Sequence, residues 1–476
     1  MASRTSILKN TIALAIPNAL NPLISFALIL VISRYLGVDG LGKYSLVFSY
    51  FGLFATVASL GLADLVVRES AKRPADTHLL LVNAGLFGTF SSIAALICMN
   101  LLVWAMGYDK DLFQASLVCS FALVISTAVS YLEAIFRSKE KSEYVAFCFL
   151  AENLIRVIMC VGLLLANYGI VALFTAVLIS RIFGLAVLLF FYTRIFGKLS
   201  WQYQPEIWNV LRTQSATFAS IAIFSTIHVS IDQILLSKLK SIESVGIYSA
   251  ADKLLTICKT IPIAFSSALL PVLTKAYSES PGEFRDLLTK SLGYILVVIL
   301  PIVVGTFILS DRFIEVIYGM KFMPAGPVLQ LHILSLIPFS MVFVLAQALI
   351  ASDNQAVDLK INIAAAFINF GLNLVFIPPL AEIGAVLATL LTIIIFNQLQ
   401  NFYIKKRLLD ISITALYFRP VVAALGMGLV TYILRDWNIL LNIAVSATVY
   451  ASLVIIVKAL SAEEIRWLTG WMFKAR

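Results

Sequence analysis

Long apolar runs separated by short polar connections dominate this chain. A helix needs about 20 mostly apolar residues to cross a bilayer, so we predict about fourteen membrane-spanning helices. The predicted spans are 10–33, 44–67, 79–106, 113–136, 144–166, 170–193, 210–236, 245–274, 288–309, 325–350, 359–378, 382–404, 413–434 and 438–459. The pattern predicts an all-α polytopic membrane protein with little chain left for a soluble domain.

The longest polar connection divides the predicted spans into blocks. We predict an N-terminal six-helix lobe (1–197), a cytoplasmic linker (198–209), a C-terminal six-helix lobe (210–405), two further helices (406–460) and a cytoplasmic tail (461–476). Trp201, Tyr203 and Trp208 in the linker suit a membrane–water interface. The tail has the amphipathic composition of an interfacial segment.

Composition and charge support a membrane protein with a defined orientation. Apolar residues make up 61% of the chain and charged residues 13%, against about 25% charged in soluble proteins. The net charge of +9 forms no basic face with interleaved aromatics, so we expect no nucleic-acid partner. With a cytoplasmic N-terminus, cytoplasmic segments hold about 23 Lys and Arg and the opposite side about 8. We therefore predict a multi-pass protein of the cytoplasmic (inner) membrane with both termini in the cytoplasm.

Two stretches of the chain repeat one another. Residues 33–45 (SRYLGVDGLGKYS) align without a gap with residues 237–249 (SKLKSIESVGIYS), and both end in Gly-x-Tyr-Ser. Each copy follows a span, faces the same side and opens a six-helix block. The repeat predicts two parallel, pseudo-symmetric lobes around a central cavity, which suits alternating access.

These segments resemble a known family of transporters. The residues that carry the resemblance are Ile7–Thr11, Arg34–Ser45, Gly61–Asp64 with Arg68 and Glu69, Ile231–Leu236 and Gly246–Ser249. Over nearly the whole chain, the sequence is similar to polysaccharide (O-antigen type) flippases of the multidrug/oligosaccharidyl-lipid/polysaccharide (MOP) exporter superfamily. The resemblance implies two six-helix lobes, often with two extra C-terminal helices.

The resemblance also implies a function that breaks no covalent bond. The expected activity moves an undecaprenyl-pyrophosphate-linked oligosaccharide from the cytoplasmic to the outer leaflet, for surface polysaccharide (O-antigen, lipopolysaccharide) biosynthesis. The expected partners are the lipid-linked oligosaccharide and membrane lipid, with a polysaccharide polymerase and a chain-length regulator. We expect no enzyme activity and no cofactor. The five cysteines lie in apolar runs without ligand spacing, so we expect no metal site.

Three alternative functions remain. Lipid II flippases share this architecture but carry charges in the first span, where this chain has mainly Asn18, Asn21 and Ser25. A cation-coupled multidrug antiporter of the same fold relies on an intramembrane acid, and Asp232 could serve. A membrane glycan polymerase or acyltransferase usually needs a sizeable polar loop or an intramembrane His or acid site, and the connections here are short.

Charged residues deep in a span are costly, so each is a functional candidate. Arg156 and Arg181, in the fifth and sixth spans, offer guanidinium groups that suit phosphate. The structural alternative is an ion pair of Arg156 with Glu152 one turn earlier, or of Arg181 with Glu152 across helices.

The eighth span carries three more charges. Asp252 and Lys259 are seven residues apart and share a face, whereas Lys253 points elsewhere. We predict Lys259 as the first phosphate contact and Lys253 as a second, although Lys253 could simply snorkel to the interface. Asp252 is a candidate for ion coupling.

Polar stripes complete the candidate set. Ser225, His228 and Asp232 share one face of the seventh span, as an ion-coupling site or as an interhelical hydrogen-bonded cluster. Substrate contacts are predicted for Asn18 and Asn21, between Pro17 and Pro22, with a static kink as the alternative. They are also predicted for Asn369 and Asn373 on the eleventh span, which could instead hold helices together. We interpret Gly61, Gly85, Gly88, Gly162, Gly184 and Gly371 as helix-contact sites.

Overall fold

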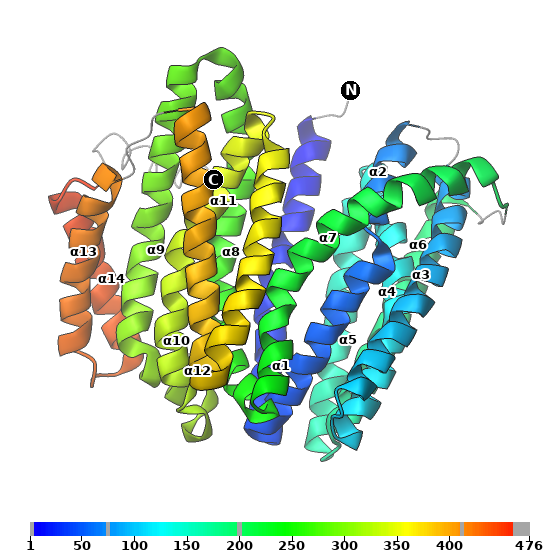
Figure 1. The fold of residues 1–476 in the computed structure, drawn as a ribbon, viewed down its shortest axis with the longest axis horizontal. Coiled ribbons are helices and arrows are strands. Elements are labelled where there is room, and N and C mark those ends of the chain that lie inside the picture. The colour runs from blue at the N-terminus through cyan, green and yellow to red at the C-terminus, as the bar shows by residue number, and fades with distance from the viewer. Residues whose placement is uncertain (1–3, 73–76, 198–201, 410–413, 460–476) are drawn as a thin grey trace. The chain divides into compact units, whose positions relative to one another are not determined.

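The computed structural model describes residues 4–72, 77–197, 202–409 and 414–459; the side chains of 4–22, 210, 214–229 and 414–417 are not described. Every regular element in these ranges is helical (Figure 1). The elements are α1 (Arg4–Ser59), α2 (Leu62–Lys72), α3 (Thr77–Ala105), α4 (Lys110–Ser138), α5 (Ser142–Leu165), α6 (Ile170–Phe196), α7 (Pro205–Leu239), α8 (Ile242–Glu279), α9 (Pro281–Tyr318), η2 (Met320–Phe322), α10 (Ala325–His332), η3 (Ile333–Ser335), α11 (Leu336–Ala351), α12 (Gln355–Arg407), α13 (Thr414–Ile433) and α14 (Ile439–Ile456).

The helices confirm the predicted all-α polytopic membrane class. Within the described residues, ten helical segments are long and apolar enough to cross a membrane, and Phe418–Ile433 is a shorter apolar helix. Two continuous helices each contain two predicted spans. α1 is broken at Gly37, where φ is 66°, and α12 bends at Ala381, where φ is 50°. Most predicted spans therefore correspond to a helix or half-helix, whereas 325–350 covers α10, η3 and α11, and 44–67 covers the end of α1 and part of α2.

Several predicted boundaries differ from the structure. The second span was expected to end at 67, but α1 ends at Ser59 because Leu60 and Gly61 both adopt positive φ. The amphipathic α2 follows as a separate helix with Leu62 and Leu65 buried. α8 and α9 continue beyond the predicted limits of 274 and 288, and they meet at Ser280, whose side chain caps α9.

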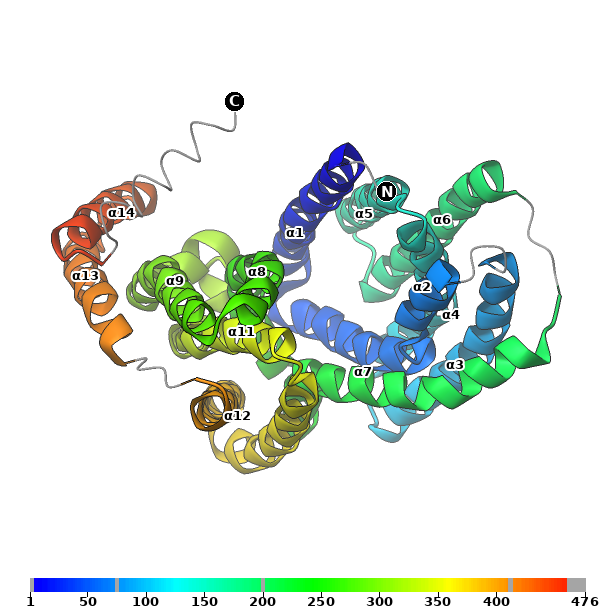
Figure 2. The same ribbon diagram turned by 90° about the horizontal axis from the view of Figure 1, so that it is seen from above.

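The chain forms two compact units, Met1–Ser249 and Ala250–Arg476, which divide within α8. In the first unit, α4 packs against α3 and α6, α5 against α1 and α6, and α7 against α1 and α3 (Figure 2). A core of Leu62, Leu132, Phe136 and Tyr192 joins α2, α4 and α6. The predicted lobe limits and linker remain predictions.

The two copies of the repeat contact one another reciprocally inside the first unit. A Cβ added to Gly42 would lie 2.2 Å from the carbonyl oxygen of Ile242, and one added to Gly246 would lie 2.1 Å from that of Val38. The repeat aligns Val38 with Ile242 and Gly42 with Gly246. Each contact is therefore the counterpart of the other, and only glycine permits so close an approach at either position.

Matching hydrogen bonds accompany this contact. Ser33 Oγ donates to the carbonyl oxygen of Leu30 at 2.8 Å, and Ser237 Oγ donates to that of Ile234 at 2.7 Å. The repeat aligns both the donors and the acceptors. The similarity in sequence is thus also a similarity in local structure.

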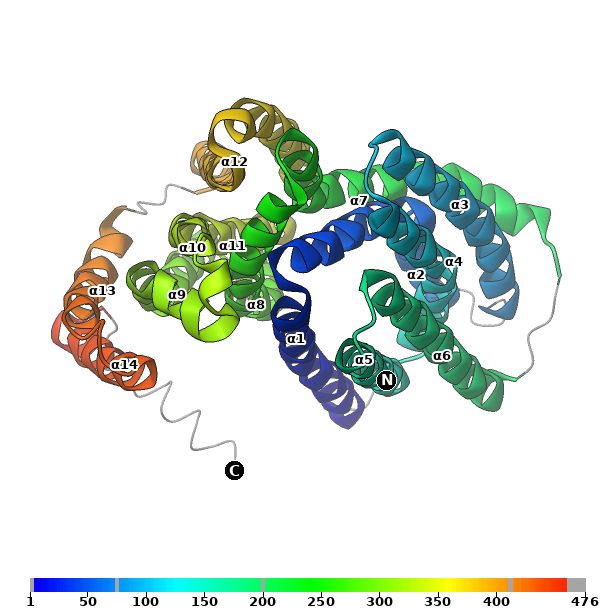
Figure 3. The same ribbon diagram turned by 90° about the horizontal axis from the view of Figure 1, so that it is seen from below.

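In the second unit, α9 packs against α10, α11 and α13, while α12 packs against α10 and α11 (Figure 3). Its main core includes Leu292, Ile295, Leu336 and Leu345. A second core joins α9, α13 and α14, where Tyr450 Oη donates to the carbonyl oxygen of Val297 at 2.6 Å. The bend at Ala381 folds α12 back along itself, so its two halves run side by side.

Candidate functional site

The first unit holds an ion pair between α5 and α6. Arg181 Nη1 lies 3.0 Å from Glu152 Oε1 and 3.2 Å from Oε2, so it contacts both carboxylate oxygens. Glu152 is buried, and Gly184 makes room for it, because a Cβ at Gly184 would lie 2.6 Å from Oε2. The pair thus forms across helices rather than between Glu152 and Arg156 on α5.

Arg156 has no acidic partner among the described side chains, none of whose carboxylates lies within ion-pair distance of it. Its Nε is buried without a hydrogen bond to a described residue. Within the same residues it makes one long hydrogen bond, 3.4 Å from Nη2 to Ser25 Oγ on α1. Ser25 belongs to the polar stripe of the first span, whose Asn18 and Asn21 side chains lie outside those described. This guanidinium can take an oxyanion without first losing an ion pair.

The second unit holds a looser charge cluster. Lys259 Nζ lies 4.0 Å from Asp252 Oδ1 and 5.4 Å from the ring centroid of Phe339, a cation–π contact. His332 on α10 is 1% exposed and within electrostatic reach of both charges. The half-buried Lys253 makes no ion pair with any described carboxylate. Lys259 is therefore held by one long ion pair and one ring.

The ion-coupling candidate Asp232 lies in a hydrogen-bonded seam of the first unit. Its buried carboxylate accepts a hydrogen bond from Tyr248 Oη at 3.1 Å. The adjacent Gln233 accepts one from Ser49 Oγ at 2.7 Å, which joins α7 to α1. The side chain of His228 lies outside the described residues. The contacts that are described favour an interhelical role for Asp232.

The two asparagines of the eleventh predicted span bond to each other. Asn369 and Asn373 are fully buried in the first half of α12, and Asn373 Nδ2 donates to Asn369 Oδ1 at 3.1 Å. One amide atom of each side chain is therefore already engaged in a hydrogen bond within the helix. Their contact with sugar remains a prediction, and both side chains are fully buried.

The loop between α3 and α4 contacts both copies of the repeat. Lys238 Nζ donates to the carbonyl oxygen of Met106 at 2.8 Å, and the hydroxyl of Tyr108 lies 2.7 Å from that of Ser237. The next residue, Asp109, forms an ion pair with Lys43. Partial burial acts to raise the pKa of Asp109, but hydrogen bonds from Lys43 and from the Leu112 backbone hold it below its usual value. The loop thus fastens to both copies of the repeat.

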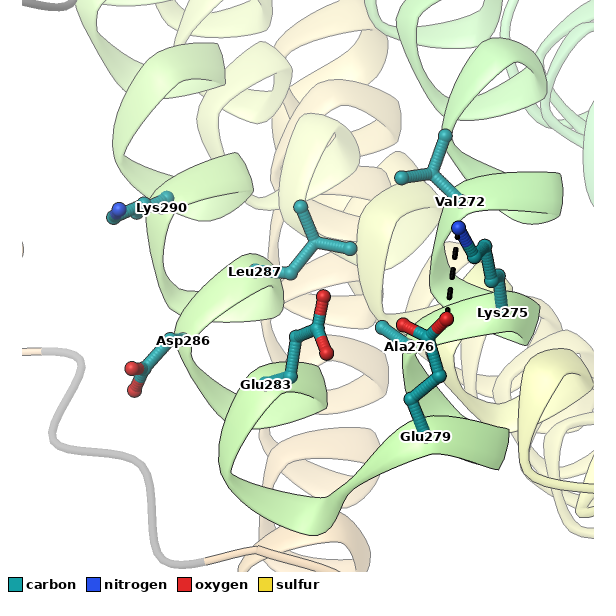
Figure 4. A pocket seen from close by; sticks show the side chains of 8 residues that line it. All are labelled: Val272, Lys275, Ala276, Glu279, Glu283, Asp286, Leu287 and Lys290. Atoms are coloured by element: carbon teal, nitrogen blue, oxygen red, sulfur yellow. Dashed lines mark ion pairs between the residues drawn. The ribbon is translucent and has the colours of Figure 1, made fainter.

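A mixed-charge groove lies between the ends of α8 and α9 (Figure 4). It has a volume of about 530 Å³ and an apolar wall of Val272, Ala276 and Leu287. The charged lining residues are Lys275, Glu279, Glu283, Asp286 and Lys290. Lys275 and Glu279 form an exposed ion pair at 3.5 Å, and exposed pairs contribute little. The groove is open, and the sequence did not predict it.

The fold brings into these clusters some residues that the sequence pattern did not indicate. His332 and Phe339 were not chosen, although an intramembrane histidine is itself a signal. Of the predicted helix-contact glycines, Gly88 and Gly184 do lie against neighbouring side chains. Gly85, Gly162 and Gly371 have no atom within 4 Å of an added Cβ. No cluster of three or more His, Cys, Asp or Glu residues that could hold a metal occurs in the described part of the chain.

Comparison with known proteins places this arrangement in a family. Residues 7–277, more than half of the chain, match the family described as "Polysaccharide biosynthesis protein". The chain is 22% identical over 415 residues to the probable low-salt glycan biosynthesis flippase Agl15 of Haloferax volcanii, covering 84% of this chain and 83% of that protein. It is 23% identical to stage V sporulation protein B of Bacillus subtilis, covering 98% of each chain.

Solved structures share the fold. The lipid II flippase MurJ in an inward closed conformation superposes with a TM-score of 0.78 at 16% identity, covering 95% of this chain and 99% of that one. An inward-facing multidrug resistance (MATE) transporter of the MOP superfamily gives 0.67 at 15% identity, covering 83% and 98%. The relatives whose names state an activity are flippases or transporters, not enzymes, and the resemblance predicted from the sequence is confirmed. The chain belongs to the polysaccharide biosynthesis protein family and has the fold of MOP-superfamily transporters.

Proposed function

We propose that this protein is a flippase that moves an undecaprenyl-pyrophosphate-linked oligosaccharide from the cytoplasmic to the outer leaflet by alternating access. Family membership supports a step in polysaccharide biosynthesis, and the names of Agl15 and MurJ support flipping of a glycan precursor. The proposed product is a surface polysaccharide of the O-antigen type. The proposed location is the cytoplasmic membrane, with both termini in the cytoplasm.

The observation that carries the proposal is the state of Arg156. Arg156 is partly buried, and no described carboxylate lies within ion-pair distance of it. A guanidinium in that state is costly in a membrane protein, and a pyrophosphate would supply charged oxygen acceptors. Arg181 lies one helix away but is neutralised by Glu152 at 3.0 Å. Arg156 is therefore the proposed phosphate contact of the first unit, and Arg181 positions Glu152.

In the second unit the proposed phosphate contact is Lys259. Its Nζ lies 4.0 Å from Asp252, longer than a good charge-assisted hydrogen bond of about 2.7–2.9 Å. An incoming phosphate oxygen can therefore displace the carboxylate at small cost. Phe339 keeps the ammonium group in place meanwhile. Lys253 is a secondary candidate at the same helix.

The test is flipping of a fluorescent lipid-linked oligosaccharide in proteoliposomes. Arg156→Gln is expected to lower the flipping rate severely while the protein still folds, since it breaks no ion pair. Arg137→Gln is the matched control, because that arginine is 42% exposed and pairs weakly with Glu133 at 3.9 Å. Equal flipping by wild type and Arg156→Gln would remove Arg156 from the substrate path.

The second candidate function is a cation-coupled multidrug antiporter. The fold shared with MATE transporters supports it, as does the buried Asp232. Efflux of cationic drugs from loaded vesicles, without flipping of the lipid-linked oligosaccharide, would favour the antiporter. In cells, loss of surface polysaccharide with build-up of its lipid-linked unit would favour the flippase. A glycan polymerase and a chain-length regulator are the proposed downstream partners.

A further inference from the structure

A buried polar contact joins the two halves of α12. Gln400 Nε2 donates a hydrogen bond to Asp358 Oδ1 at 2.6 Å. Gln400 has no solvent exposure, and Asp358 is partly buried. The residues are 42 positions apart, and the bend at Ala381 brings them together.

The oxygen atoms of Asp358 and Gln400 outnumber the described hydrogen-bond donors that reach them. Gln400 Oε1 is buried and accepts no hydrogen bond from the described residues. Across the same described part of the chain, no Lys, Arg or His lies within ion-pair distance of Asp358. Gln400 Oε1 belongs to the same amide group whose Nε2 bonds the carboxylate, and no described positive charge lies within ion-pair distance of that carboxylate. An uncompensated charge in such a place is strongly unfavourable.

A neighbouring amide adds a third group. Asn397 is one turn before Gln400 on the same helix face, is 6% exposed, and has a buried Nδ2 atom that finds no acceptor in the described residues. Rotating the amide by 180° exchanges Nδ2 for Oδ1. The same side chain can then offer an oxygen in place of the unbonded nitrogen.

The helix end also favours an anion at Asp358. The residue lies in the first turn of α12, where the helix dipole supplies about half a positive charge. That partial charge offsets only part of the charge of an ionised carboxylate. The negative charge that remains on an ionised Asp358 would be balanced by one monovalent cation bound to these oxygen atoms.

We propose that Asp358 and Gln400 form a binding site for a monovalent metal cation, with Asn397 as a third ligand after its amide rotates. Hard cations take carboxylate and amide oxygens, and one carboxylate balances one charge. The bound ion would link the two halves of α12, because Asp358 and Gln400 lie on different halves. A role of this ion in driving transport rests on the proposed flippase function, whereas binding itself does not.

The test measures ion-dependent stability of the purified protein in detergent. Thermal unfolding is followed in NaCl, KCl and choline chloride at equal ionic strength, with radioactive sodium binding in parallel. For wild type, Tm is expected to rise with the concentration of Na⁺ or K⁺ beyond its value in choline, because ligand binds only the folded state. Asp358→Asn is expected to lose both the Tm shift and saturable sodium binding.

Matched variants keep the test decisive. Asp353→Asn removes an exposed acid five residues away, at a positive φ that Asn tolerates, and should keep the ion response. Gln400→Met, which retains the side-chain volume, should weaken the ion response. It serves as the second test variant in case Asp358→Asn fails to fold. No metal-ion effect in wild type, an equal effect in Asp358→Asn, or a response to pH alone would overturn the site.

The failure of the site and of the flippase proposal can be told apart. Flipping of lipid-linked oligosaccharide without any metal-ion binding would reject the site and retain the function. Ion binding lost in Asp358→Asn, in a protein that flips no lipid-linked oligosaccharide, would retain the site and reject the function.

Discussion

The reciprocal contact between Gly42 and Gly246 predicts an unusual pair of mutational effects. A methyl group at position 42 would lie 2.2 Å from a backbone oxygen, whereas ordinary contact begins at 3.4 Å. The two backbones would therefore have to separate by roughly 1.2 Å. Overpacking of this kind costs about 1–3 kcal/mol, and a backbone oxygen cannot move aside as a side chain can. We expect Gly42→Ala and Gly246→Ala each to lower the free energy of unfolding by about 3 kcal/mol.

The double variant distinguishes this geometry from two independent clashes. Once one methyl group has separated the backbones, the second finds room already made. We expect the double variant to lose about 3–4 kcal/mol rather than about 6, a coupling of about 2–3 kcal/mol. Circular dichroism during unfolding in mixed detergent micelles measures each value.

Gly85→Ala is the control, because no atom lies within 4 Å of an added Cβ there. It should be neutral or slightly stabilising, since Ala favours helix over Gly. Losses for the two single variants that add to within about 0.5 kcal/mol in the double variant would refute the shared separation. Single variants as stable as Gly85→Ala would refute the close contact itself.

Three further predictions test individual charges. Arg181→Gln should lower the free energy of unfolding by about 3–5 kcal/mol in the same micelle assay, because Glu152 is left buried without its partner. A loss in free energy of unfolding below about 1 kcal/mol, as for an exposed ion pair, would contradict this. Asp252→Asn should raise the apparent affinity for lipid-linked oligosaccharide, since Lys259 loses its competing carboxylate; an unchanged KM for flipping would count against it. Asp109 has a lowered pKa in the fold, so its contribution, at most about 1 kcal/mol for an exposed pair, is present above pH 4–5 and lost at lower pH. The stability difference between wild type and Asp109→Asn should therefore be constant near neutrality and shrink as the pH falls below the ordinary aspartate pKa of about 3.9, and a difference that does not shrink in acid would disprove the assignment.

The predicted spans were largely correct because hydropathy over about 20 residues is a local property of the chain. The end of α1 at Ser59 was missed because it depends on the backbone angles of Leu60 and Gly61. An apolar Leu at positive φ gives no polar signal in the sequence. The kinked connection at Ala381 is likewise a matter of backbone conformation within an apolar stretch.

The charged residues could be nominated from the sequence, but their pairing could not be chosen. Glu152 had two arginines within plausible reach, one on its own helix and one on the next. The packing of α5 on α6 decides for Arg181, and Gly184 allows that approach. The contact of Gln400 with Asp358 depends on how α12 folds back, which no spacing along the chain reveals. Long-range geometry of this kind lies beyond local patterns.

The symmetry of the glycine contact bears on how this chain arose. In an isologous interface, residue i of one copy contacts residue j of the other, and j contacts i. Val38 with Gly246 and Gly42 with Ile242 obey this rule within a single polypeptide. A half-length ancestor that paired with itself about a two-fold axis would have made the same contact twice from one glycine. Gene duplication and fusion would then have turned one glycine position into two. Each can mutate independently, but a glycine at one position does not relieve the clash caused by a larger residue at the other.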